Sequence, residues 1–221
     1  MASLLKFVAS PITEGHFSAP SFYLAFFTYL TIMRQFLRHS HAALVIALSV
    51  GATSVAWSDQ TDPVLPSLFQ DLQTVTEPAD IQRITAEIWQ RWSTHPTEDT
   101  LTARLTRGVT MMNQGDYIHA EGIFTDIIAE DPNFAEAWNR RATLYFIMGQ
   151  FGKSRADIAE TLAIEPRHFG ALAGLGLIEM HLQNYEAALL AYEEAAAIHP
   201  HMGEVNDIIA RLQEKVKGLA L

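Results

Sequence analysis

Two histidines close together, in His199-Pro200-His201-Met202, form the grouping in this sequence that most resembles a metal site. Imidazole nitrogens are ligands for zinc, copper and nickel. No carboxylate lies at a chelating helical spacing from either histidine, and Pro200 belongs to a regular series of prolines described below. We therefore expect an ordinary loop at this place and predict no metal site.

A second grouping, Arg167-His168, stands where a helix could begin after Pro166. Basic side chains and free backbone N–H groups at a helix start can bind an anion. The simpler interpretation is a loop between helices, with Arg167 in solvent and Phe169 buried, and we adopt it. His119 and His181 each stand alone on a helical stretch and are interpreted as structural or surface residues.

Motifs for enzyme chemistry are absent from the sequence. It contains no phosphate-binding glycine loop, no H-E-x-x-H metal motif, no nucleophile elbow and no cysteine. Gly174-Leu175-Gly176 falls inside a helical stretch, and Glu193-Glu194 should face solvent. We therefore predict a protein that is not an enzyme and that needs no cofactor.

Composition narrows the class of partner. The chain has 221 residues, of which 49% are hydrophobic and 18% charged, which is typical of a globular protein. Its net charge of −10 and its 15 scattered Lys and Arg residues disfavour nucleic acid as a partner. The absence of cysteine also excludes disulfides, thiolate metal sites and a lipidated-cysteine anchor.

The segment before residue 57 is apolar and almost free of acidic residues. From Met33 it has a basic start, an apolar core at Ala42–Val50, and the small residues Ser54 and Ala56. This is the pattern of a secretory signal peptide, which we place at 33–56, with 1–32 as an over-extended gene start. The alternative is an uncleaved membrane anchor at Phe17–Met33, the one way in which this chain would meet a membrane.

Residues 57–98 predict a linker followed by a helical hairpin. Apolar residues recur at three- and four-residue spacing in two stretches between 63 and 95, and Glu77–Asp80 forms the turn between them. This hairpin does not fit the pattern of the sequence that follows it. We interpret it as an N-terminal cap.

A 34-residue period dominates the rest of the chain. Three residues of one type stand 34 apart in each of five series: Pro132, Pro166 and Pro200; Gly108, Ala142 and Gly176; Tyr117, Phe151 and Tyr185; Ala120, Ser154 and Ala188; Phe124, Ile158 and Tyr192. The small residues would let two helices cross closely, and the prolines would end the second helix of each unit. This pattern predicts helices near 101–113, 117–130, 135–148, 151–164, 169–182 and 185–198, and a last one near 203–217.

Series of small, aromatic and proline residues at this period resemble the tetratricopeptide repeat (TPR) family. Copy two shows the family pattern best, in Trp138, Ala142, Tyr145 and Pro166, although Arg141 stands where the family usually has Leu. The resemblance implies an all-α fold, an α-solenoid of three helix-turn-helix units. We expect these units at 101–134, 135–168 and 169–202 of a TPR domain spanning 99–221, with the hairpin and the helix 203–217 as caps.

The family usually binds peptides on the concave side, which the first helix of each unit lines. Carried over by position, the resemblance implies this set of partner-binding residues: Leu105, Val109, Met112, Asn139, Arg140, Thr143, Phe146, Ile147, Leu177, Met180 and His181. TPR domains that grip the acidic tail of heat-shock chaperones use several Lys, Asn and Arg residues. Only Arg140 offers charge at the corresponding positions here, so that function is not expected.

Two interpretations of this surface remain open. The apolar residues could accept a partner segment while Asn139 and Arg140 bond its backbone or a carboxylate. Alternatively, some of the side chains pack between helices, or the hairpin covers them. The resemblance implies an adaptor that binds a protein or peptide, and the signal-like segment predicts export to the periplasm; a membrane-tethered assembly protein is the alternative.

Overall fold

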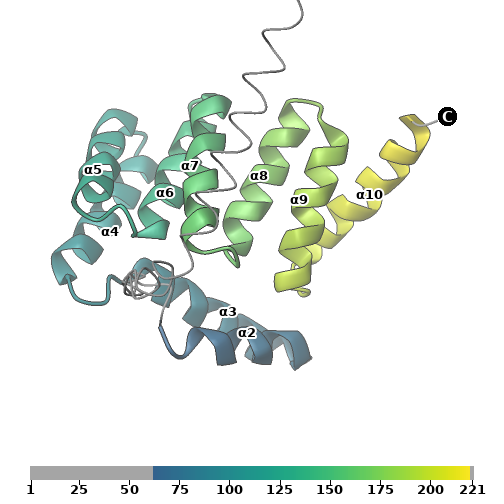
Figure 1. Cartoon of the computed structure of the whole chain (residues 1–221), viewed down its shortest axis with the longest axis horizontal. Helices are drawn as coiled ribbons and strands as arrows, with labels where there is room; N and C mark the ends of the chain where they lie inside the picture. The colour runs from purple at the N-terminus through teal and green to yellow at the C-terminus, as the bar shows by residue number, and fades with distance from the viewer. Residues whose placement is uncertain (1–61, 220–221) are drawn as a thin grey trace, which may run out of the picture. The chain divides into compact units, whose positions relative to one another are not determined.

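The computed structural model describes residues 62–219, and every regular element in that part of the chain is a helix (Figure 1). The helices are α2 (Leu65–Thr74), α3 (Pro78–Ser93), α4 (Asp99–Asn113), α5 (Tyr117–Glu130), α6 (Ala135–Ile147), α7 (Phe151–Ile164), α8 (Phe169–His181), α9 (Tyr185–Ile198) and α10 (Gly203–Leu219). The predicted signal peptide and gene start lie outside these residues. No helix from 62 to 219 is long and apolar enough to cross a membrane.

The helices from α4 to α9 form three consecutive antiparallel pairs, which confirms the predicted all-α solenoid. Each helix packs mainly on the one before and the one after it in the chain, and α10 packs on α9 at the end of the stack (Figure 1). Val205 and Leu212 of α10 are buried against Ala188 and Tyr192 of α9, so α10 covers the apolar face that the last pair leaves open.

The turn inside each pair ends its first helix with a left-handed residue. Gly115, Gly149 and Gln183 have φ values of 82°, 71° and 61°, and they stand 34 residues apart. Such a residue lets the chain reverse while its N–H groups satisfy the last helical carbonyls. This is why α6 and α8 end at Ile147 and His181, one residue before the sequence-based expectation.

The glycines of the small-residue series face aromatic rings. A Cβ at Gly108 would lie 2.5 Å from the Phe124 ring, and one at Gly176 would lie 2.7 Å from the Tyr192 ring. These glycines therefore lie against the aromatic residue of the partner helix, where a side chain would collide with the ring. Only in the middle pair do the two small residues meet in a hydrogen bond, where the Ser154 hydroxyl donates to the Ala142 carbonyl at 2.7 Å.

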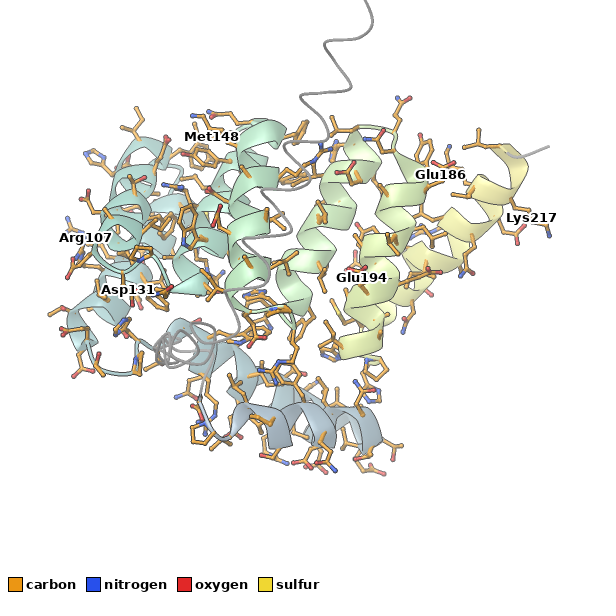
Figure 2. The ribbon with its side chains drawn as sticks, viewed as in Figure 1. Arg107, Asp131, Met148, Glu186, Glu194 and Lys217 are labelled. Atoms are coloured by element: carbon orange, nitrogen blue, oxygen red, sulfur yellow. The ribbon has the colours of Figure 1, made fainter. Side chains whose placement is uncertain are left out.

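The α2–α3 hairpin does not stack on the first pair as an additional unit. It runs along the lower edge of the stack in Figure 1, where the loops between pairs lie. In Figure 2, Asp131 in the loop before α6 lies at that lower end, and Met148 after α6 lies at the upper end. The hairpin residues share a buried cluster with Phe169 at the start of α8 and with Ile198 and Met202 around the last loop.

Candidate partner-binding groove

The first helices of the second and third pairs, α6 and α8, border a small open pocket with α7 beneath it. Its volume is about 100 Å³. The lining residues are Asn139, Ala142, Thr143 and Phe146 of α6, Ser154 and Ile158 of α7, and Gly170, Gly174 and Leu177 of α8. Four of the sequence-predicted partner-binding residues, Asn139, Thr143, Phe146 and Leu177, are thus brought together here.

The neighbouring surface of α6 and α8 exposes apolar side chains. Ile147 is 48% exposed and Leu177 is 37% exposed, so two large aliphatic side chains of these helices face solvent. The rings of Phe146, Phe151 and His181 gather beside them, with centroids 5.2 to 5.5 Å apart. We call the pocket together with Ile147 and His181 the α6–α8 groove.

The residues predicted on α4 do not join this groove. Leu105 and Met112 are only 2% and 7% exposed, because they belong to the core of the first pair around Phe124 and Ile127. Val109 is half-buried against the same core, and Met180 on α8 packs in the cluster formed with α9 and α10. The candidate surface therefore omits Leu105 and Met112 and centres on α6 and α8.

The polar pair Asn139 and Arg140 is already occupied within the protein. The fully buried Glu136 carboxylate accepts from Asn139 Nδ2 at 3.0 Å and lies 2.6 Å from Arg140 Nη2. Burial favours a raised pKa for the Glu136 carboxyl, but the bonds from His168 and Asn139 and the charge of Arg140 outweigh it, so that its pKa is lowered. The carboxylate is ionised, and its charge cancels that of Arg140.

His168 completes this network and connects it to the hairpin. Its Nδ1 accepts the Ala171 backbone N–H at 3.0 Å, which leaves the proton on Nε2 to be donated to Glu136 at 3.0 Å. The imidazole also stacks on the Trp92 ring of α3, with centroids 4.1 Å apart and planes 12° from parallel. His168 is thus a buried bridge between α3, α6 and α8, and not an anion-binding residue.

Trp89 of the hairpin closes one end of the groove. Its ring lies so near Gly170 that a Cβ there would be 2.5 Å away, and the Arg140 guanidinium lies 5.7 Å from its centroid. The hairpin therefore covers Gly170 and Arg140 but leaves Thr143, Ile147 and Leu177 open. Sequence reasoning missed Trp89 because it lies outside the repeat, and the groove residues that it contacts, Arg140 and Gly170, are more than 50 residues away.

The other candidate chemical groups have structural partners. His199 Nε2 lies 3.0 Å from Thr85 Oγ1, and His201 Nε2 donates to the Leu72 carbonyl at 3.0 Å. No group of three metal-ligating side chains occurs between residues 62 and 219. Arg167 bonds Glu165 at 3.0 and 3.1 Å, while Phe169 is 2% exposed.

Comparison with known proteins gives consistent matches. Two family models described as tetratricopeptide repeat match residues 140–202 and 123–156. A TPR repeat-containing protein of Rhizobium etli is 34% identical over 154 residues, which cover 70% of this chain and 75% of that protein.

Two solved structures share the fold. The first TPR domain of Spaghetti (RPAP3), bound to an HSP90 peptide, has a TM-score of 0.51 at 21% identity and covers 53% of this chain and 93% of that one. The Yersinia enterocolitica secretion chaperone SycD, in complex with a peptide of the translocator YopD, has a TM-score of 0.51 at 12% identity and covers 54% and 96%.

Proposed function

This chain belongs to the tetratricopeptide repeat family, and from that premise we propose that it is a non-catalytic adaptor that binds a segment of another protein in the α6–α8 groove. The observation that carries the proposal is the open pocket between α6 and α8, flanked by the exposed Ile147 and Leu177. Apolar side chains at a concave site, with a few polar groups beside them, are what a docked peptide requires.

The fold neighbours support this kind of ligand. Spaghetti and SycD are each described in complex with a peptide of another protein. The peptide of the first ends in an acidic sequence, EEVD. In this chain the one cation at the corresponding positions, Arg140, is paired with the buried Glu136, so an acidic tail is not the proposed partner.

For cellular location we propose export to the periplasm after cleavage of residues 33–56, which places the partner in the cell envelope. The alternative is a membrane-tethered assembly protein that keeps its N-terminal segment. Sequencing the N-terminus of the purified natural protein tests this. A mature start near Trp57 or Asp59 is expected, whereas an intact N-terminal segment would contradict cleavage.

The groove is tested by a charge placed on its exposed apolar surface. Leu177→Asp should abolish most partner capture by the whole chain, because a carboxylate in this apolar surface would be desolvated without a counter-ion on binding. Leu190→Asp is the matched control, since Leu190 is 59% exposed on α9 and does not line the groove. If the Leu177→Asp variant captures the partner as well as the natural protein does, the groove is not the binding site.

A further inference from the structure

Gly174 stands in the middle of α8 with no packing reason to be glycine. A Cβ built there would meet only Ile158 Cδ1, at 3.6 Å, which is ordinary van der Waals contact. The other two glycines within α8 differ, because a Cβ at Gly170 would collide with Trp89 and one at Gly176 with Tyr192. Glycine in a helix interior costs about 1 kcal/mol relative to alanine, so Gly174 weakens α8 without improving its packing.

What Gly174 does provide is space. It forms part of the wall of the pocket between α6 and α8, and Ile158 of α7 lines the same space. At the equivalent repeat positions the other units carry Thr106 and Arg140, both of which have side chains. Because residue 174 has no side chain, this part of the pocket wall stays open.

The chemistry of the pocket favours an uncharged apolar occupant. None of its nine lining residues is ionisable. The hydroxyls of Ser154 and Thr143 donate to the Ala142 and Asn139 carbonyls, so both protons are already used within the protein. Nearby, the charges of Arg140 and Glu136 cancel, so this pair adds no net charge beside the pocket that would attract an ionised partner.

The size of the pocket restricts the occupant further. Its volume of about 100 Å³ is smaller than the cavities of about 150 Å³ that accept benzene in protein interiors. The volume of a branched aliphatic side chain matches this space more closely than that of a phenyl or indole ring does. We propose that the Gly174 pocket is a receptor for one Val, Leu or Ile side chain from a partner segment that is uncharged next to that residue.

This inference rests on the proposed adaptor function and specifies the partner by its chemistry. The test is a selection of phage-displayed random peptides on the whole chain, followed by fluorescence anisotropy with the selected peptides. Peptides with a neutral stretch around one aliphatic residue should be enriched. Replacing that residue by Ala, Phe or Asp should weaken binding by about tenfold or more, the loss expected for one buried side chain.

Variants of the protein separate the pocket from the rest of the groove. Gly174→Leu fills the pocket and should also weaken binding by about tenfold or more, and Gly174→Ala should have a smaller effect. Gly122→Ala is the matched control, since Gly122 is exposed in the middle of α5 with nothing within 4 Å of an added Cβ. Both alanine variants should raise the melting temperature, and only the one at 174 should affect the peptide.

The outcomes distinguish this inference from the adaptor proposal. Two outcomes would overturn the pocket assignment while the groove proposal stands. In one, the selected peptides lose binding to Leu177→Asp but still bind Gly174→Leu. In the other, the selected peptides are enriched in aromatic or charged residues. If no peptide is enriched, or if the selected peptides bind Leu177→Asp unchanged, both the pocket and the groove fail.

Discussion

Arg141 shows how one residue that departs from the family pattern is accommodated. Its guanidinium makes two hydrogen bonds to the Asp157 carboxylate, at 2.7 and 2.9 Å, and a third to Thr125 Oγ1 at 3.1 Å. It also lies 5.0 Å from the Trp138 ring centroid, and its pKa is raised by the bond to Asp157. In the third unit the equivalent positions hold Leu175 and Ala191, so this ion pair stands where the third unit has two apolar residues.

Removing one member of this pair should cost far more than removing both. Asp157→Ala should lower the free energy of unfolding by about 2–4 kcal/mol, because the Arg141 side chain, 13% exposed, would lose its counter-ion. The double variant Arg141→Leu with Asp157→Ala copies the third unit and should recover most of that loss. Urea unfolding measures all three proteins, and a double variant no more stable than Asp157→Ala would contradict this account.

The α2–α3 hairpin, with the loop that follows it, acts as a brace that contacts every loop between pairs. His95 Nε2 lies 2.8 Å from Asp131 in the first loop, and Trp92 stacks on His168 in the second. At the third, Thr85 bonds His199, and Gln73 Nε2 donates to the Ala197 and Ile198 carbonyls at the end of α9. One element thereby links units that otherwise contact only their neighbours.

Docking of the hairpin should weaken in mild acid. Burial lowers the pKa of His199 from its ordinary value of 6.5, and the adjacent His201 lowers it further. The undocked imidazole therefore binds a proton more readily than the docked one. Docking is fully favoured above about pH 6.5 and loses at most about 1.4 kcal/mol per pH unit as the pH falls below it.

Hydrogen exchange of the α2 and α3 amides, corrected for the intrinsic rate at each pH, measures this effect. Protection should decrease between pH 7.5 and 5.5 in the natural protein and much less in His199→Asn. His119→Asn is the control, because that imidazole is 76% exposed on α5. Equal loss of protection in the natural protein and in His199→Asn would rule out His199 as the cause.

At the scale of the whole molecule, the buried Glu136 joins the hairpin, the second pair and the third pair. Its carboxylate is bonded by His168 from the loop before α8 and by Asn139 of α6, and His168 in turn stacks on Trp92. Breaking this junction would separate three elements at once. Protonation of Glu136 should therefore lower the free energy of global unfolding.

Because the folded-state pKa of Glu136 is lowered below its ordinary value of 4.5, its ionised form stabilises the fold above that pH. This stabilisation should be lost as the pH falls below about 4.5. Glu136→Gln should unfold more easily at pH 7, by about 1–3 kcal/mol, and should show a smaller further loss in acid. Glu186→Gln, at an exposed position of α9 labelled in Figure 2, should follow the natural protein in urea unfolding at both pH values.

Much of the fold follows from local signals in the sequence. The prolines at 132, 166 and 200, the small residues 34 apart and the left-handed turns at 115, 149 and 183 each act within a few residues of the chain. They determined the helical pairs, most helix ends and the stacking order, because every pair contacts its sequence neighbours. The family resemblance also directed attention to the first helices, which is why Thr143, Phe146 and Leu177 were among the expected residues.

The tertiary structure decided what depends on contacts between distant residues. The bond from His168 to Glu136 spans 32 positions, and that from Thr85 to His199 spans 114. A periodic sequence pattern does not predict such pairings, because they depend on which side chains face each other once the stack has formed. The sequence alone therefore determined a three-unit solenoid. Only packing decided that the hairpin braces its edge, that Leu105 and Met112 are buried, and that the open pocket lies at Gly174.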